Sequence, residues 1–419
     1  MGVSFLFINK MHRNKVAINS NLYSVKPSED QYIMNKATRI IIPSYVSRFQ
    51  CIGGDCEDSC CIGWDIDIDK LTFRKYFRTK NMEMKKDFVK HVYRNDNCDS
   101  EEVDYGRLRI NDSKWCPFLD EKKLCRIYSN LGEDYLSNVC FSYPRVYNIL
   151  DDEYELSLYM SCPEAIRIML ADMKPIEFIA EELTLDKHII HSYIDTRDNK
   201  WNNSPIGRLK ELRTLSIEII QDRKISLTER LIKLGNKLEN ESMPYNSINE
   251  QDNHVIQLQF FTGAIESLQV FSEIDSPVFV EYSKKIMSGF KLEEDLPIAD
   301  KARCYKEALE HIVDPFLKEN SYLFEHYLVN FMFQSNFPFT ENQDMFDGYV
   351  MLVIRYGFIK FYLSGIAAVE GEITREDVVL MIQIYTKTVE HHKTFIIDLL
   401  QDCKQNEFDN MHFLSSLLK

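Results

Sequence analysis

The cysteines of this chain are concentrated in one region, and this distribution constrains the fold more than any other feature. Nine of the eleven cysteines lie between Cys51 and Cys162, and only Cys304 and Cys403 follow. Cytosolic thiols are kept reduced, so a dense group of them in a cytoplasmic protein indicates metal binding rather than disulfides. The distribution therefore predicts an N-terminal metal-binding domain, followed by a domain of another kind.

The first cysteines follow the spacing C-x4-C-x3-C-C, beginning at Cys51. Gly53 and Gly54 lie inside this motif, and glycine allows a chain to fold back between closely spaced ligands. Cys60 and Cys61 are adjacent, so their side chains are expected to diverge. They could serve two metal ions, or one could bind metal while the other packs.

Eight cysteines are the candidate metal ligands because they lie in or just after this cluster. They are Cys51, Cys56, Cys60, Cys61, Cys116, Cys125, Cys140 and Cys162. Eight thiolates could fill two four-cysteine zinc sites, or hold one iron–sulfur cluster (4Fe-4S) with thiols to spare. The spacing lacks the C-x2-C pairs of zinc fingers. The remaining cysteines, Cys98, Cys304 and Cys403, are predicted to be small buried residues.

The chain after about Glu164 has helical periodicity. Apolar residues recur at helical spacing in four segments, at residues 209–220, 258–268, 349–363 and 378–389. Thr374, with Asp377 three residues later, predicts the N-cap of the last segment. This half is predicted to be an all-helical bundle.

These patterns predict a mainly α protein. A small, loop-rich cysteine-cluster metal domain with short extended segments would pack on a C-terminal α-helical bundle. The predicted domains are a weakly structured N-terminal lead at residues 1–36, the cysteine-cluster domain at residues 37–165 and the α-helical domain at residues 166–419.

Charge and hydropathy limit the classes of function. The formal net charge is −15, which repels phosphate backbones and disfavours nucleic-acid binding. The same charge would attract a lysine-bearing surface. The apolar stretch at residues 361–369 is far shorter than the roughly 20 residues of a membrane span, so no membrane association is predicted. The N-terminus lacks the order of a secretory signal, and the protein is predicted to be cytoplasmic.

Four short motifs carry a resemblance to a known family. They are CEDSCCIGW at residues 56–64, CPFLD at 116–120, LCRIY at 124–128 and CFSYPR at 140–145. These motifs resemble the cysteine-cluster family of zinc- or iron-chelating domains. Weaker matches at residues 212–223, 229–231, 327–330 and 390–392 are similar to one branch of it, the flagellin lysine-N-methylases. The resemblance covers roughly residues 37 to 400.

The resemblance implies a protein-lysine N-methyltransferase with a cysteine-ligated metal or iron–sulfur site. Its methyl donor would be S-adenosylmethionine, and its substrate would be the lysine ε-amines of flagellin. Two other classes stay open. One is a non-enzymatic metal or iron–sulfur binding protein, and the other is a flagellin-binding scaffold with structural metal.

Methyl transfer to lysine needs a base and a site that orients the donor. An amine with a pKa near 10.4 must lose its proton before it attacks the methyl group. Glu57, Asp58 and Tyr143 lie beside the cysteine motifs and are the candidate catalytic residues. Arg145 is the candidate for binding the donor's carboxylate, since a guanidinium binds carboxylates bidentately.

Overall fold

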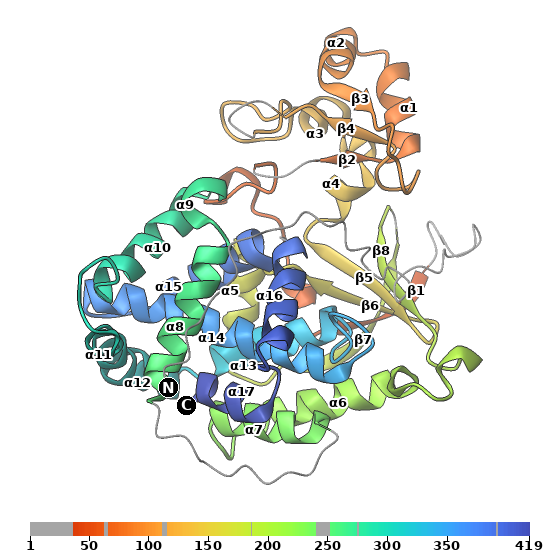
Figure 1. Cartoon of the computed structure of the whole chain (residues 1–419). Helices are drawn as coiled ribbons and strands as arrows, with labels where there is room; N and C mark the ends of the chain where they lie inside the picture. Colours follow the sequence, from red (N-terminus) through yellow and green to blue (C-terminus); the bar gives the residue numbers. More distant parts are fainter. Residues whose placement is uncertain are drawn as a thin grey trace. The chain divides into compact units, whose positions relative to one another are not determined.

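The computed structural model describes residues 37–62, 66–110, 115–185, 187–239, 252–274, 276–390 and 393–419. They form two compact units. The N-terminal unit comprises residues 37–168 and Glu177–Asp195, and the helical unit comprises Met169–Ile176 and Thr196–Lys419 (Figure 1). The predicted lead at residues 1–36 lies outside the described residues.

Five strands of the N-terminal unit form one mixed sheet in the order β7-β1-β6-β5-β8. Their bounds are β1 Ala37–Pro43, β5 Arg145–Leu150, β6 Glu153–Leu158, β7 Phe178–Thr184 and β8 Ile190–Ile194. β5 and β6 form an antiparallel hairpin, and its turn holds Asp151 and Asp152 at φ values of 53° and 66°. A tight hairpin turn requires such left-handed residues, which aspartate tolerates.

This sheet is larger than the short extended segments that the sequence predicted. β1 pairs with β7 and with β6, both of which follow much later in the chain. Pairing between such distant segments leaves no local pattern to detect. The strands β7 and β8, in a region that the sequence analysis included in the helical domain, therefore belong to the N-terminal unit.

The cysteine region of this unit is built from short elements and turns. A three-stranded sheet has the order β2-β4-β3. The elements are β2 Asp67–Ile68, α1 Lys70–Arg78, α2 Met82–His91, β3 Val92–Arg94, β4 Gly106–Leu108, α3 Arg126–Leu131, α4 Asn138–Ser142 and α5 Pro163–Leu170. Short 3₁₀ turns lie at Val46–Arg48, Gly53–Asp55 and Glu133–Tyr135.

One aspartate joins two of these helices. Asp69 caps α1 by accepting from Thr72 N at 2.8 Å, and its second oxygen accepts from Asn138 N at 3.0 Å. Asn138 is the first residue of α4. A fully satisfied carboxylate at an N-cap typically contributes about 1 kcal/mol to helix stability. Asp69 thus brings α4, and Cys140 within it, to the start of α1.

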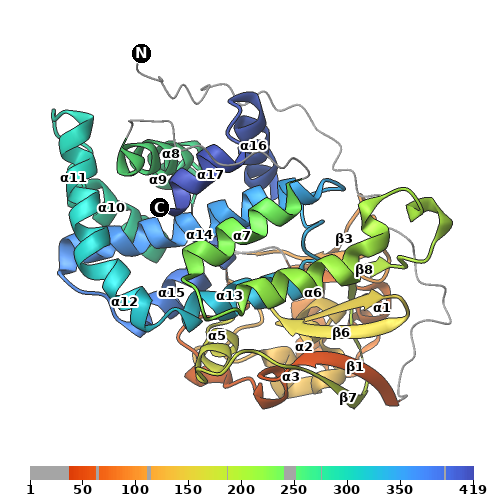
Figure 2. The ribbon, with the colours of Figure 1, turned by 90° about the horizontal axis from the view of Figure 1, so that it is seen from below.

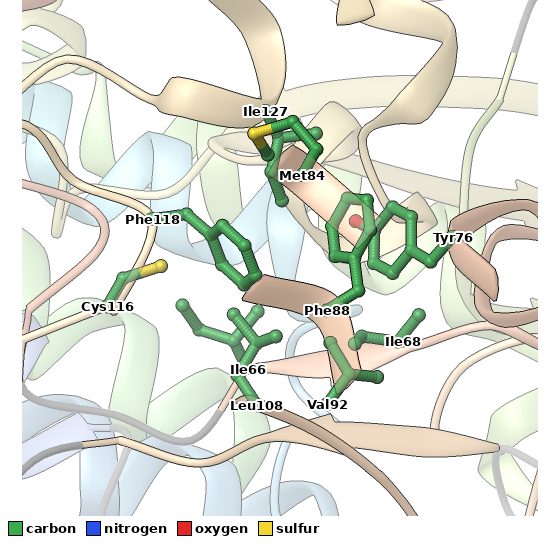
Figure 3. Packing of buried hydrophobic residues seen from close by; sticks show 10 residues of the cluster. All are labelled: Ile66, Ile68, Tyr76, Met84, Phe88, Val92, Leu108, Cys116, Phe118 and Ile127. Carbon is green, nitrogen blue, oxygen red and sulfur yellow. The ribbon is translucent and has the colours of Figure 1, made fainter. Parts of the chain in front are cut away.

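A small apolar core holds the cysteine region together (Figure 3). Tyr76 of α1 stacks on Phe88 of α2 with ring centroids 4.0 Å apart, and Phe88 also contacts Phe118. Figure 3 shows Cys116 at the edge of this cluster, near Phe118. Cys116 therefore belongs to the same apolar core as residues of α1 and α2.

The helical unit contains the following helices in chain order: α6 Leu209–Ile220, α7 Leu227–Leu238, α8 Asn253–Ser267, α9 Val270–Glu273, α10 Pro277–Gly289, α11 Ile298–Ala308, the π-helix Leu309–Val313, α12 Asp314–Glu319, α13 Tyr322–Gln334, α14 Met345–Glu370, α15 Arg375–Tyr385, the π-helix Thr386–Glu390, α16 Lys393–Gln405 and α17 Met411–Leu418. Short 3₁₀ turns at Asn199–Trp201 and Pro205–Arg208 precede them. The prediction of a helical C-terminal half is confirmed.

The expected N-cap of α15 is also confirmed. Thr374 Oγ1 accepts from Asp377 N at 3.3 Å, and Asp377 Oδ2 accepts from Thr374 N at 2.7 Å. This reciprocal capping box satisfies two amide groups that would otherwise lack partners.

The long helix α14 is the core of the helical unit. It contacts α7, α10, α11, α13, α15, α16 and α17, and Figure 2 shows it passing beside α7 and α17. α14 is long and apolar enough to cross a membrane, which the sequence analysis did not anticipate, but its most apolar window is 100% buried within the protein. Such burial is typical of the core helix of a folded domain.

Candidate functional site

Four cysteines from distant parts of the sequence come together around the small apolar core. Cys116 belongs to this core, and Cys61, Cys125 and Cys140 pack against it. Cys116 N donates to Cys61 O at 2.9 Å, and an isolated antiparallel bridge joins Leu119 to Cys125. Backbone pairing thus brings the motif of Cys61 beside that of Cys116, and the motif of Cys116 beside that of Cys125.

Cys60 and Cys61 do not diverge as expected. Their Sγ atoms lie 3.8 Å apart. The two residues lie in a turn, where Cys61 N donates to Ser59 Oγ at 3.2 Å, so the alternation of an extended strand does not apply. Two sulfurs that share one tetrahedral zinc, each at about 2.3 Å, are also about 3.8 Å apart. The pair therefore has the spacing of two ligands of one metal.

Two further thiols, those of Cys56 and Cys162, interact electrostatically with each other, and Cys162 also interacts with Cys60. The thiols of Cys56 and Cys60 both raise the pKa of Cys162, which burial raises most, to about 12. Cys56 is half-buried, and Cys51 is exposed. Seven of the eight predicted ligands thus influence one another's pKa electrostatically, and Cys51 is exposed.

Several sulfurs share one hydrogen-bonding arrangement. Each accepts from the backbone N–H two residues later, and the pairs are Cys56 with Asp58, Cys116 with Phe118, Cys125 with Ile127 and Cys162 with Glu164. Such bonds favour the thiolate, the form that binds metal. Burial acts in the opposite direction and raises the pKa of Cys116 and of Cys140 to about 12. The neighbouring thiols raise these pKa values further, so deprotonation of the group needs added positive charge.

The sulfur donors fit a thiophilic metal in chemical type, but their spacing does not enclose one. Among the described residues, no three histidine, cysteine, aspartate or glutamate side chains lie close enough together to hold one ion. The metal ligands therefore remain a prediction.

The three remaining cysteines differ from one another. Cys403 is buried, as predicted. Cys98 and Cys304 are only partly buried. Cys98 Sγ donates to Asp104 Oδ1 at 3.4 Å, so its thiol orders the loop before β4 instead of filling the core.

The three predicted catalytic residues have different environments. Glu57 forms an ion pair with Arg167, which also pairs with Glu164. Tyr143 is half-buried, and its hydroxyl lies 3.0 Å from Ser161 Oγ. Burial raises the pKa of Tyr143, and the thiols of Cys162 and Cys60 and the carboxylate of Asp58 raise it further. Tyr143 thus lies near the thiols but holds its proton tightly.

Asp58 and Arg145 are placed differently. Asp58 is half-buried, and its Oδ1 accepts from Ser59 N at 2.8 Å. Arg145 begins β5, and its guanidinium lies over the ring of Phe49, 5.4 Å from the centroid. A cation–π contact of this kind leaves the edge of the guanidinium available for hydrogen bonds.

The helical unit contains a buried polar cluster that the sequence analysis missed. Arg355 lies in the middle of α14 with only 4% of its surface exposed. Its Nη2 lies 2.8 Å from Glu341 Oε1, and its Nε lies 3.7 Å from Glu390 Oε1. Tyr327 of α13 donates to Glu390 Oε1 at 2.5 Å. The sequence did contain a signal for this cluster, namely the arginine at position 355 within an apolar helical segment. Such an arginine is rarely buried unless it is paired.

A family model and three relatives match this sequence. The model of the FliB lysine N-methylase C-terminal domain matches residues 213–417. A lysine-N-methylase of Salmonella typhimurium is 22% identical over 393 residues, which cover 85% of this chain and 93% of that protein. The lysine-N-methylase of Salmonella choleraesuis has the same identity and coverage.

The third relative aligns with a shorter part of the chain. It is the flagellar biosynthetic protein FliU of Salmonella muenchen, 31% identical over 159 residues, which cover 37% of this chain and 90% of that protein. No solved structure matches the chain.

The two methylase relatives align with this chain along nearly their whole length. The chain is therefore a protein of the lysine methylase type. More narrowly, the chain belongs to the flagellin lysine-N-methylase family, as the cysteine motifs and the helical matches predicted.

Proposed function

We propose that this protein transfers the methyl group of S-adenosylmethionine to lysine ε-amines of flagellin. The alignment with lysine-N-methylases over 85% of the chain carries the proposal, because it includes both units. The similarity to a flagellar biosynthetic protein favours flagellin as the substrate. The net charge of −15 suits a lysine-bearing partner and disfavours nucleic acid. A cytoplasmic location, without membrane association, follows if flagellin is modified before export.

The reaction is a displacement at carbon. The neutral lysine nitrogen forms a bond to the methyl carbon, and the carbon–sulfur bond breaks with its electron pair passing to sulfur. S-adenosylhomocysteine leaves, and a base accepts the proton that the amine loses. Proximity and alignment of the two reactants supply much of the rate.

Among the predicted catalytic residues, Asp58 fits the base best. Glu57 is engaged by Arg167, and the raised pKa of Tyr143 keeps its phenol protonated. Tyr143 suits a hydrogen-bond donor that positions a reactant instead. Arg145 is one of two arginines that could bind the donor's carboxylate, and the second belongs to the buried cluster in the helical unit.

We also propose that the clustered cysteines hold zinc or a 4Fe-4S cluster. The ligands would come from Cys56, Cys60, Cys61, Cys116, Cys125, Cys140 and Cys162, with exposed Cys51 as a further ligand if its segment folds inward. The backbone N–H bonds to four of these sulfurs and the 3.8 Å separation in the adjacent pair support this. When bound, the metal would supply positive charge that keeps the thiols deprotonated.

The test is methyl transfer to flagellin by the full-length protein. The protein, purified without oxygen, is incubated with flagellin and S-adenosylmethionine, and lysine methylation is followed by mass spectrometry. Asp58→Asn should lower kcat about 10²- to 10⁴-fold, the usual contribution of a positioned base. Asp55→Asn, in the exposed 3₁₀ turn nearby, is the matched control and should leave kcat unchanged.

Failure of methylation by the unsubstituted protein would overturn the proposed function. A protein that carries redox-active metal but transfers no methyl group would favour the metal-carrier alternative. A protein that binds flagellin without methylating it, and whose metal is redox-inactive, would favour the scaffold.

A further inference from the structure

The buried cluster around Arg355 has hydrogen-bonding capacity that the described protein atoms leave unused. Nε and Nη1 of Arg355 and Oε1 of Glu341 are inaccessible to solvent and have no hydrogen-bond partner. Glu341 Oε1 lies 2.8 Å from Arg355 Nη2, but the two atoms are not aligned for a hydrogen bond. Buried polar groups are almost always hydrogen-bonded, so such a group of exceptions indicates an additional binding partner.

The cluster combines separate parts of the helical unit. Arg355 comes from α14, Glu341 from the connection between α13 and α14, and Glu390 from the end of the π-helix Thr386–Glu390. Phe331 of α13 forms one wall, since the Arg355 guanidinium lies 4.6 Å from its ring centroid. π-helical turns within α-helical segments occur frequently at functional sites.

The unused groups define the chemistry of the partner. A guanidinium with two N–H groups that make no hydrogen bond can bind a carboxylate, and a carboxylate oxygen that accepts no hydrogen bond can bind an ammonium. An α-amino acid presents both groups on one carbon. Glu390 is engaged by Tyr327, and burial raises the pKa of its carboxyl group, so Glu341 is the carboxylate of the cluster that suits a ligand ammonium.

We propose that Arg355 and Glu341 bind the α-amino-acid end of the methyl donor. This inference rests on the proposed function, because S-adenosylmethionine carries an α-carboxylate, an α-ammonium and a cationic sulfonium. Arg355 takes the carboxylate through Nε and Nη1, and Glu341 takes the ammonium. Tyr327 holds Glu390 in place and is a positioning residue.

Binding of two adenosyl compounds to the full-length protein tests the proposal. S-adenosylhomocysteine has the α-amino-acid end, and methylthioadenosine lacks it, so calorimetry of both isolates the contribution of that end. Arg355→Lys keeps the charge but loses the planar fork. It should weaken S-adenosylhomocysteine binding about 10- to 100-fold, as loss of charged hydrogen bonds does, and leave methylthioadenosine binding unchanged.

A second variant and a control account for effects on folding. Glu341→Gln, in the segment between the helices, should also weaken S-adenosylhomocysteine selectively. Lys360→Met removes another partly buried cation of α14, paired with Asp314 at 2.8 Å, and should leave both affinities unchanged. Circular dichroism and melting temperature verify that each variant is folded.

Each outcome decides between specific possibilities. If Arg355→Lys and Glu341→Gln weaken the binding of both compounds equally, or weaken neither, the inference is overturned. The proposed function still stands in that case, provided that the unsubstituted protein binds S-adenosylhomocysteine. Binding of free methionine at the cluster, without binding of S-adenosylhomocysteine, would identify a free amino acid as the source and overturn the assignment to the donor. Selective loss in Arg145→Lys, with Arg355→Lys unaffected, would assign the donor's carboxylate to Arg145.

Discussion

Arg230 Nη1 lies 2.8 Å from Glu325 Oε2, and both side chains are buried. Arg223 binds the same carboxylate with Nε and Nη2, the latter at 2.7 Å from Oε1. Arg230 also donates to Ile220 O at 2.8 Å and to Ile225 O at 2.9 Å. One fully buried carboxylate of α13 is thus held by two arginines, and it fixes the turn between α6 and α7.

Removing this carboxylate's charge should destabilise the protein strongly. Glu325→Gln leaves buried Arg230 without a counter-charge, and breaking a buried pair in this way typically costs about 3–5 kcal/mol. Urea unfolding measures the change in free energy. Glu211→Gln, in the exposed ion pair with Arg208, is the control and should not change the free energy of unfolding measurably. Equal effects of the two variants would contradict the assigned role of Glu325.

His326, the next residue, should make stability depend on pH. Its Nδ1 lies 3.1 Å from Met169 O, and burial lowers the pKa of this imidazole. The unfolded chain therefore binds a proton more readily than the folded chain, so stability is present above the unfolded pKa of about 6.5 and is lost as pH falls below it.

The matching variant is His326→Gln. Between about pH 7.5 and about pH 5.5, the unsubstituted protein should lose up to about 1 kcal/mol more stability than this variant does. Urea unfolding at both pH values measures the difference. Parallel losses in the two proteins would show that other groups cause the pH dependence.

Gly348 near the start of α14 should not tolerate a side chain. A Cβ atom there would lie 1.9 Å from Pro338 O, a backbone atom that cannot rotate away. Gly348→Ala should therefore cost about 1–3 kcal/mol or more, as overpacking does. Val369→Ala, at an exposed position of the same helix, is the comparison and should have little effect on thermal unfolding. An unchanged melting temperature for Gly348→Ala would refute the close approach.

The protein purified without oxygen should contain a thiolate-bound metal. Cys125→Ser and Cys140→Ser should lower the metal content measured by elemental analysis, because each removes a soft ligand from the cluster. Visible absorption distinguishes an iron–sulfur cluster from colourless zinc. Cys304→Ser in the helical unit is the control and should keep the full metal content. Absence of both iron and zinc from the unsubstituted protein would exclude the proposed site.

The sequence by itself determined the features that depend on local patterns. Helical periodicity identified α6, α8, α14 and α15 because each helix buries one face at regular intervals. The Thr374 N-cap was predictable because capping joins residues only three apart. The grouping of Cys61, Cys116, Cys125 and Cys140 followed from their motifs, since thiols concentrated in one segment of the chain can share one site.

Only the tertiary structure decided how distant segments meet. The sheet that joins β1 to β7, the approach of the Cys60 and Cys61 sulfurs, and the convergence of Arg355, Glu341 and Glu390 leave no local signal. Strand pairing depends on partners far along the chain, and the direction of a side chain in a turn depends on backbone angles that spacing does not fix. Arg355 was visible as a charge in an apolar helix, but its partners became known only when α13, α14 and the π-helix after α15 were packed together.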